Sequence, residues 1–257
     1  MQKFTIALAV ASVLALTACG GGGSSNPQTT TPPQAAPAQP VAISMTADFT
    51  KGIDGWTVGM ADYGQGGEPS EAAYGYMTLP QQLYGELNGQ FGSAAGFYLI
   101  SRNNSDDLLT FVKRQLSGFV PGVKYKLSFK LKYATDAAAD AGCAGVGGSR
   151  GDNVYMIAAA SSDEPKVVKE DNDYRLNIDH GNQNQAGTQS VVLGTQGAPG
   201  LSCDGGKWAI TSHKSDDTVT VTADKAGKLW VVLGTDSGFE STNALYLLSA
   251  TIDATPQ

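Results

Sequence analysis

The chain is poor in histidine and in charge. It has two histidines, and only 16% of its 257 residues are charged. Nucleophilic triads need a base, which is usually histidine, and neither His180 nor His213 stands in a recognisable catalytic motif. We therefore expect both to be loop or surface residues. The sequence predicts no catalytic residue.

Basic residues are also scarce. The 17 lysines and arginines face 24 aspartates and glutamates, which gives a formal net charge of −7. A dedicated nucleic-acid-binding domain should carry a basic footprint, so this charge argues against nucleic acid as a partner. The 32 glycines and the low charge favour turn-rich β structure over a helical bundle.

No apolar run reaches the roughly 20 residues needed to span a bilayer. An apolar segment lies at the N-terminus, where Lys3 precedes a short apolar core from Ile6 to Leu16. Ala18 supplies the small residue that a secretory cleavage site requires before Cys19. Residues 1–18 are therefore predicted to be an export signal.

The run Leu16-Thr17-Ala18-Cys19 resembles the lipobox of bacterial lipoproteins, in which the cysteine is lipidated and becomes the mature N-terminus. The resemblance implies lipidation of Cys19 and attachment to a membrane of the cell envelope. In many such lipoproteins an aspartate after the cysteine retains the protein at the inner membrane. Gly20 stands there in this chain, which favours the outer membrane. The alternative is an ordinary signal peptide with a coincidental cysteine.

Only three cysteines are present, and two remain once Cys19 is assigned to lipid. Export would place Cys143 and Cys203 in a compartment that permits disulfides. As the two remaining cysteines, they are predicted to form a disulfide with each other. Two free thiols are the alternative. Neither cysteine has a second cysteine or a histidine at metal-ligand spacing, so metal ligation there is not expected.

A low-complexity segment follows the predicted lipidation site. Gly20 to about Pro40 is rich in glycine, proline, glutamine and threonine and cannot bury a core, so we expect a disordered tether. The sequence therefore divides into a signal peptide (1–18), a lipidated cysteine with its linker (19–42) and one folded domain (43–257).

Apolar residues in the folded part recur with a period of two. Between Val123 and Tyr133 they alternate strictly with lysine and serine, which predicts a strand with one buried and one solvated face. No amphipathic helical window is found. The chain is expected to form a single antiparallel β-sandwich, with a barrel as the alternative. Further strands are predicted at 41–49, 74–79, 96–101, 107–116, 153–160, 189–194, 208–213, 217–223, 228–234 and 244–253.

Three segments together resemble galactose-binding-like jelly rolls, the sandwich used by many carbohydrate-binding modules. They are Phe49–Trp56, Leu116–Tyr133 and Ala250–Asp253. The resemblance implies a jelly-roll topology. It also implies a structural calcium between the first and last strands, at the positions of Asp48 and Asp253; no other cofactor is expected. The stretch from Gly234 to Glu240 resembles one found in uncharacterised bacterial lipoproteins.

Aromatic residues beside amides and carboxylates are the usual ingredients of a saccharide site. Four tyrosines gather in one glycine-rich region, an Arg-Asn-Asn run follows, and Trp208 and Tyr174 lie near polar loops. Aromatic residues also serve sheet packing, which is the alternative for each of them. The candidate ligand-binding residues are Tyr63, Tyr74, Tyr76, Tyr84, Arg102 and Asn103.

Two charged patterns have both a functional and a structural interpretation. Asp106-Asp107, Asp171/Asp173 and Asp236/Glu240 could pair for acid–base work, but aspartate is also favoured in turns. A basic row holds Lys113, Arg114 and Lys124, Lys126, Lys130 and Lys132. It could grip an anionic polysaccharide or lipid head groups; a solvated face or an edge strand protected by lysine is the structural alternative.

The sequence thus favours a membrane-anchored, non-catalytic lipoprotein that binds a saccharide or another envelope component. One alternative is a jelly-roll carbohydrate-active enzyme, a glycosidase or lyase. Such an enzyme should hold an arginine, a tyrosine or histidine and a carboxylate together in a cleft. A structural or assembly lipoprotein with a protein partner is the other alternative.

Overall fold

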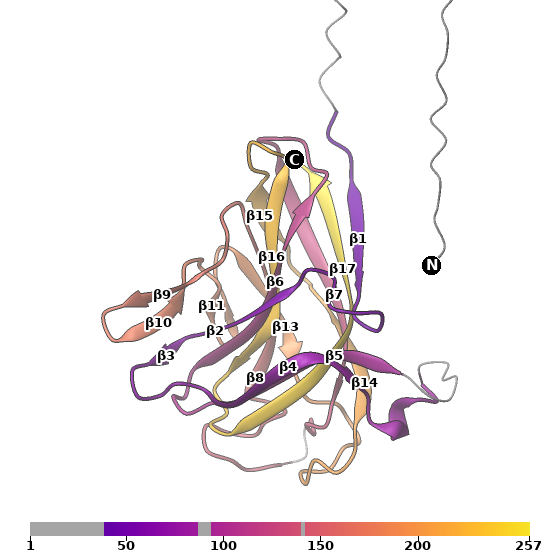
Figure 1. Cartoon of the computed structure of the whole chain (residues 1–257), viewed down its shortest axis with the longest axis vertical. Helices are drawn as coiled ribbons and strands as arrows, with labels where there is room; N and C mark the ends of the chain where they lie inside the picture. Colours follow the sequence, from indigo (N-terminus) through magenta and orange to yellow (C-terminus); the bar gives the residue numbers. More distant parts are fainter. Residues whose placement is uncertain (1–38, 87–93, 140–141) are drawn as a thin grey trace, which may run out of the picture. The chain divides into compact units, whose positions relative to one another are not determined.

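The computed structural model describes residues 39–86, 94–139 and 142–257 (Figure 1). The predicted signal peptide, Cys19 and most of the predicted tether lie outside these residues. Ala38–Gln257 form one compact unit. Within the described residues, no helix has the length and apolar character needed to cross a membrane.

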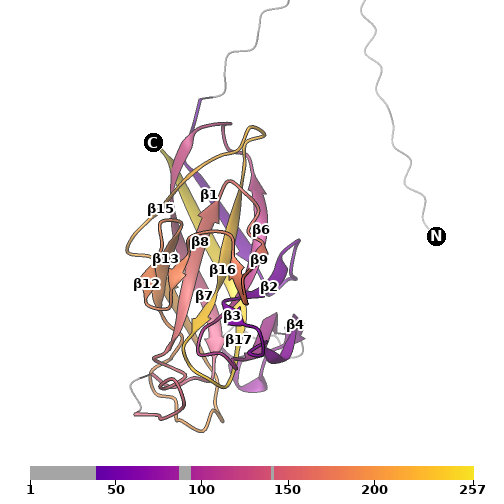
Figure 2. The same cartoon turned by 90° about the vertical axis from the view of Figure 1, so that its left-hand side faces the viewer.

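Two antiparallel sheets make up this unit. The larger has the order β14-β7-β17-β5-β4, with β1 also paired to β17 and β15 to β7. The smaller has the order β13-β8-β16-β6-β2. Figure 2 views the domain with the smaller sheet toward the reader. The strands of the larger sheet are β1 (Ile43–Asp48), β4 (Ser70–Thr78), β5 (Ala95–Arg102), β7 (Lys124–Thr135), β14 (Ala209–Lys214), β15 (Val219–Thr222) and β17 (Thr242–Pro256). Those of the smaller are β2 (Thr57–Ala61), β6 (Leu108–Ser117), β8 (Val154–Ser161), β13 (Ser190–Thr195) and β16 (Lys228–Ser237).

Successive strands pass from one sheet to the other. The chain runs from β5 in the larger sheet to β6 in the smaller, back to β7 and across again to β8. This alternation builds a two-layer sandwich of the jelly-roll kind, and the predicted all-β fold is confirmed. The described residues contain one helical turn, the 3₁₀ segment η1 (Gln81–Leu83).

The main core fills the space between the sheets. On β7 the alternate residues from Tyr125 to Tyr133 are almost fully buried, while the lysines between them point outward. Leu229, Val231 and Leu233 of β16 face them from the smaller sheet, which β16 crosses between β8 and β6. Burial of such side chains stabilises the fold by about 1.5–3 kcal/mol each.

The outer face of the smaller sheet is covered by a second layer. Short strands β9 (Val167–Glu170) and β10 (Asp173–Leu176) pair with each other, and β10 also pairs with β3 (Tyr63–Gly64). These strands are seen at the side of the domain in Figure 1. Strands β11 (Gly181–Asn182) and β12 (Gln185–Ala186) follow. Leu176 and Ile178 from this layer pack on outward residues of the sheet, including Phe111.

Cys143 and Cys203 form the predicted disulfide, with 60 residues between them in sequence. The bond links two loops at one end of the sandwich, directly after β7 and before β14. The pairing inferred from counting cysteines is confirmed.

Replacing both cysteines by serine should lower the free energy of unfolding by roughly 4 kcal/mol, because the unfolded chain regains the entropy of a loop of this length. Urea denaturation of Ala38–Gln257, with and without the Cys143→Ser/Cys203→Ser pair, measures the change. Equal midpoints for the two proteins would contradict this expectation.

Candidate functional site

An aromatic cluster lies on the outer face of the larger sheet. Tyr98 of β5 is directly opposite Tyr246 of β17, and their ring centroids are 4.7 Å apart. The Trp208 ring meets Tyr246 edge-on at 5.2 Å. We call these three residues the aromatic floor. They rest on the buried side chains of Leu79, Leu83, Ala134 and Leu248, which fix their positions.

The aromatic floor is open to solvent on the side away from the core. Tyr246 is 8% exposed, but Tyr98 and Trp208 are only half-buried. Gly75 of the edge strand β4 lies opposite Tyr98, and a Cβ placed there would contact nothing within 4 Å. An accessible ring beside open space can stack on the apolar face of a sugar ring.

Charged groups border the aromatic floor. Extending the β7–β14 register by one residue places Asp136 opposite Trp208. Burial raises the pKa of Tyr98, and the charge of Asp136 adds to that rise. Arg150 forms an ion pair with Asp136 at 3.0 Å. Together with Phe239 and the disulfide, these two residues line a cavity of about 270 Å³.

The six predicted ligand residues are divided among several parts of the molecule. Tyr84 packs at the aromatic floor, and Arg102 lies on the same sheet face, where its Nη1 donates to Ser241 Oγ at 3.3 Å. Tyr74 and Tyr76 are exposed, at 58% and 48%, on the opposite face of β4.

The remaining two ligand candidates have packing or structural contacts. Tyr63 stacks on Tyr174 in the layer over the smaller sheet, with centroids 4.9 Å apart. Asn103 is 2% exposed, and its Nδ2 donates to the Ser237 and Phe239 carbonyl oxygens. Its position between backbone carbonyls assigns it to loop structure.

The two predicted calcium ligands are not brought together. Asp48 is opposite Ser249, whereas Asp253 is opposite Ser44, so four residue positions of the β1–β17 ladder separate the two carboxylates. Asp48 already accepts hydrogen bonds from Thr50 and pairs with Lys51 at 2.9 Å. In the part of the chain that the structure describes, no three acidic, histidine or cysteine side chains form a metal-binding group. This pair therefore does not fit a shared ion.

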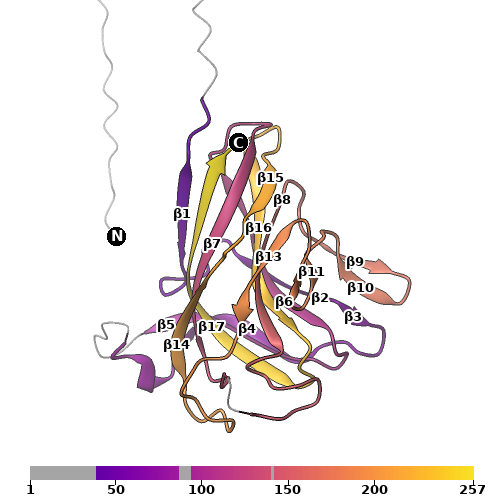
Figure 3. The same ribbon diagram turned by 180° about the vertical axis from the view of Figure 1, so that it is seen from behind.

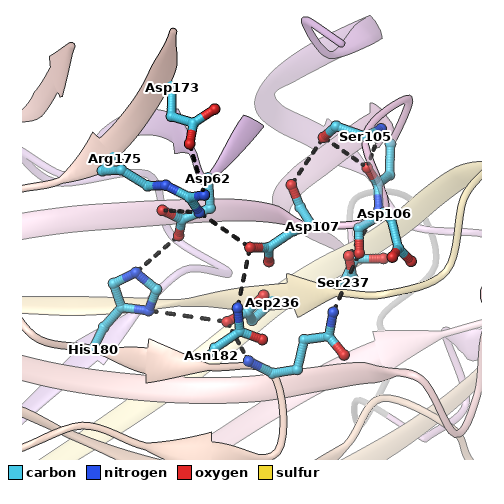
Figure 4. A network of polar contacts seen from close by, with 12 residues as sticks. Asp62, Ser105, Asp106, Asp107, Asp173, Arg175, His180, Asn182, Asp236 and Ser237 are labelled. Atoms are coloured by element: carbon cyan, nitrogen blue, oxygen red, sulfur yellow. Dashed lines mark hydrogen bonds and ion pairs between the residues drawn. The ribbon is translucent and has the colours of Figure 1, made fainter. Parts of the chain in front are cut away.

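A second polar cluster lies under the layer that covers the smaller sheet (Figure 4). His180 Nε2 is 2.8 Å from Asp62 Oδ2, and His180 Nδ1 is 3.9 Å from Asp236 Oδ2. Arg175 reaches Asp62, Asp107 and Asp173 at distances of 3.2–3.6 Å. The backbone N–H of Gln183 donates to Asp236 Oδ2 at 2.7 Å. We call these six side chains, Asp62, Asp107, Asp173, Arg175, His180 and Asp236, the carboxylate network.

Burial shifts the ionisation of this network. Burial and the nearby charge of Asp107 raise the pKa of Asp236 to about 7. Burial and the charge of Asp62 also raise the pKa of Asp107, against the opposing effect of Arg175. For His180, burial alone would lower the pKa, but the hydrogen bond to Asp62 and the surrounding carboxylates raise it overall.

The carboxylate network corrects two sequence interpretations. His180 lies in a loop, as predicted, but it is 7% exposed and lies between carboxylates, not on the surface. Asp236 is 1% exposed within β16, not in a turn. His213 lies on β14, where it stacks on Tyr133 and its Nε2 is 2.7 Å from the Thr195 carbonyl. Neither histidine is a free surface residue.

One serine motif was missed at the sequence level. Gly147 to Gly151 has the Gly-x-Ser-x-Gly spacing of a nucleophile elbow. The structure places Ser149 in a loop, where its hydroxyl donates to Asp152 at 2.6 Å. The strand-to-helix turn that exposes such a nucleophile is not formed here.

Comparisons with known proteins identify no family. No family model and no curated protein matches the chain. Among solved structures, the carbohydrate-binding module TmCBM61, solved with β-1,4-galactotriose, is 9% identical, with 80% of this chain and 97% of that one covered and a TM-score of 0.32. The CBM22-1 xylan-binding domain of Paenibacillus barcinonensis Xyn10C is 9% identical, covering 85% and 97%, with a TM-score of 0.35. An enzymatically active tailspike domain of bacteriophage CBA120 is 8% identical, with a TM-score of 0.32, and this chain covers 77% of its own length and 19% of that domain. Likeness at this level identifies neither a family nor a ligand.

The carboxylate network predicts that stability falls as pH rises. Folded Asp236 keeps its proton up to about pH 7, whereas an unfolded aspartate releases it near 3.9. The native state therefore binds more protons between these values, and the free energy of unfolding falls across that range. The raised pKa values of His180 and Asp107 act in the same direction. Asp236→Asn should flatten this dependence, as measured by urea denaturation between about pH 4 and pH 8.

Asp217→Asn is the matched control, because Asp217 is exposed and lies outside the carboxylate network. It should leave the slope against pH unchanged. An Asp236→Asn slope equal to that of the wild type would show that the network does not set the pH dependence.

Proposed function

We propose that this protein binds a polysaccharide on the outer face of its larger sheet. The aromatic floor is the observation that carries the proposal. Three rings from strands β5 and β17 and the segment before β14 contact one another, and two of them, Tyr98 and Trp208, are partly accessible to solvent. Asp136 and Arg150 stand beside it and can bond to sugar hydroxyls.

Exposure favours this proposal over simple sheet packing. Tyrosines that serve packing, such as Tyr125 and Tyr133, are fully buried between the sheets. Tyr98 and Trp208 keep part of their rings in water although they pack in one cluster with Ala134 and Leu248 of the sheet and with Leu79 and Leu83 of the segment after β4. Large aromatic side chains held half-exposed by a rigid support are suited to stacking on a ligand.

Trp208→Ala should weaken polysaccharide binding by on the order of tenfold, because one stacking partner is lost. Affinity electrophoresis of Ala38–Gln257 against a panel of neutral and acidic polysaccharides measures the change. Tyr74→Ala is the control, since Tyr74 is more exposed but lies on the other face of β4. No retention of the wild type by any polysaccharide, or equal losses in both variants, would count against the proposal.

We further propose that the domain is held at the cell envelope by lipid on Cys19, and acts there by binding alone. The lipobox-like run and the glycine- and proline-rich segment after it support this. Labelled palmitate should enter the wild-type chain but not Cys19→Ala, and the variant should leave the membrane fraction. Membrane sedimentation that is unchanged in Cys19→Ala, without label in either protein, would contradict lipid anchoring.

One observation favours an enzyme as the second candidate. The carboxylate network holds an arginine, a histidine and several carboxylates together, and the pKa of Asp236 is raised to about 7, as in general acids. Asp236 is almost fully buried, while Asp107 and Arg175 reach the surface. Reducing-sugar release by the wild type that is lost in Asp236→Asn would support this candidate. If no polysaccharide of the panel releases reducing sugar, the enzyme candidate is rejected and the binding proposal stands.

A further inference from the structure

A group of lysines extends along the same sheet face as the aromatic floor. Lys124, Lys126, Lys130 and Lys132 alternate along β7 with its buried residues and so point away from the core. Lys214 of β14 is directly opposite Lys130 and also exposed. We call these five residues the lysine row. Figure 3 shows β7 from behind, with β14, β15 and β17 beside it.

The lysine row has no ionic partners among the residues that the structure describes. None of its five members lies within ion-pair distance of a carboxylate there. Several basic residues elsewhere in this acidic chain are paired. Lys113 bonds Glu164 at 2.8 Å, and Arg114 bonds Asp54 at 2.7 Å, both on the smaller sheet.

The arrangement is costly to the fold. Like charges directly opposite on neighbouring strands are destabilising, and Lys130 and Lys214 are such a pair. Protection of a sheet edge does not explain the row, because β7 lies between β17 and the β14/β15 strands. The acidic strand residues on this part of the face are Asp253 of β17 and Asp48 of β1, and Asp48 pairs with Lys51; Asp216 and Asp217 stand in the loop at its border. Positive charge prevails on this face of a protein whose net charge is −7.

The lysine row continues into the aromatic floor. Lys132 precedes Ala134 by two residues on β7, and Ala134 is directly opposite Tyr246 on one side and Ile210 on the other. From Lys132 back to Lys124 the row extends for eight residues, or about 27 Å of strand. Several outward residues of the adjoining strands carry hydroxyl groups, among them Ser249, Thr251 and Thr220.

We propose that the lysine row binds the acidic groups of a linear anionic polysaccharide whose sugar rings stack on the aromatic floor. This inference rests on the proposed function and names its substrate class. A linear polyanion matches an extended row of cations on a flat sheet, and regularly placed hydroxyls supply its hydrogen bonds. An anionic membrane is the less suitable occupant, because the residues beside the row include Ser249, Thr251 and Thr220, which offer no apolar side chain for insertion. The large apolar side chains of this face, such as Ile210 and Trp208, gather beyond Lys132 at the aromatic floor and are partly buried there.

The experiment compares two triple variants of Ala38–Gln257 with the same net charge. Lys126→Gln/Lys130→Gln/Lys132→Gln removes the centre of the row, and Lys51→Gln/Lys169→Gln/Lys225→Gln removes three lysines from elsewhere. The probes are polygalacturonate, neutral galactan, polyphosphate and phosphatidylglycerol vesicles. The row variant should bind polygalacturonate on the order of tenfold more weakly and with a smaller dependence on salt, while the control variant stays near the wild type.

Stability supplies an independent readout. Lys130→Gln removes one member of the opposed Lys130–Lys214 pair, so it should raise the midpoint of thermal unfolding while it weakens polygalacturonate binding. A loss of binding through misfolding would instead lower that midpoint. Lys225→Gln, at an exposed lysine outside the row, should change neither value.

Several outcomes would overturn the inference. Equal losses in the two triple variants would show that net charge alone acts. Polyphosphate or vesicles bound as tightly as polygalacturonate would show that the row recognises charge without sugar, or a membrane surface. Galactan binding that depends on Trp208, with no binding of polygalacturonate, would remove the inference and leave the proposed function standing.

Discussion

The strict alternation along β7 is the constraint on which the rest of the structure depends. Its residues Tyr125, Leu127, Phe129, Leu131 and Tyr133 are buried against the smaller sheet. Because a shift of one residue would exchange the two faces of a strand, this burial fixes the register of β7 with β17, β14 and β15. The same register decides which residues meet on the outer face.

The outer faces of the two sheets differ in how far other segments cover them. The smaller sheet buries its outer face beneath β9 and β10, and the carboxylate network joins that layer to β2, β6 and β16. Charges that are buried and bonded in this way contribute to a defined arrangement more reliably than to net stability. The larger sheet leaves its face open, with aromatic rings at one end and lysines along the rest.

Most strands could be predicted from sequence because period two is a local signal. Each predicted strand corresponds to an observed one, whereas β2, β9, β10 and the two-residue strands β3, β11 and β12 were missed. β2 has Gly59 at its centre, where the Phe111 ring occupies the space of a side chain, and β9 and β10 carry charges that obscure alternation. The disulfide could also be predicted, since few cysteines leave few pairings.

The sites were harder to foresee because they depend on pairing between distant segments. Tyr98 and Tyr246 each resemble ordinary strand aromatics, and only their register makes them neighbours. His180 and Asp236 likewise meet through the packing of the covering layer on β16. A sequence window around either residue contains no sign of the other. The four tyrosines that are neighbours in the sequence, by contrast, are divided among different elements: Tyr63 lies on β3, Tyr74 and Tyr76 share one face of β4, and Tyr84 follows η1.

The pairing of β1 with the end of β17 has a geometric consequence. Ile43 lies opposite Ala254, so the chain enters the domain beside its own C-terminus, while Tyr246 lies eight residues earlier on β17. At 3.3–3.4 Å per residue, those eight residues separate the entry point from the aromatic rings by about 27 Å. The point where the chain enters the domain and the aromatic floor therefore lie toward opposite ends of β17, so a segment attached at residue 43 does not begin beside the rings.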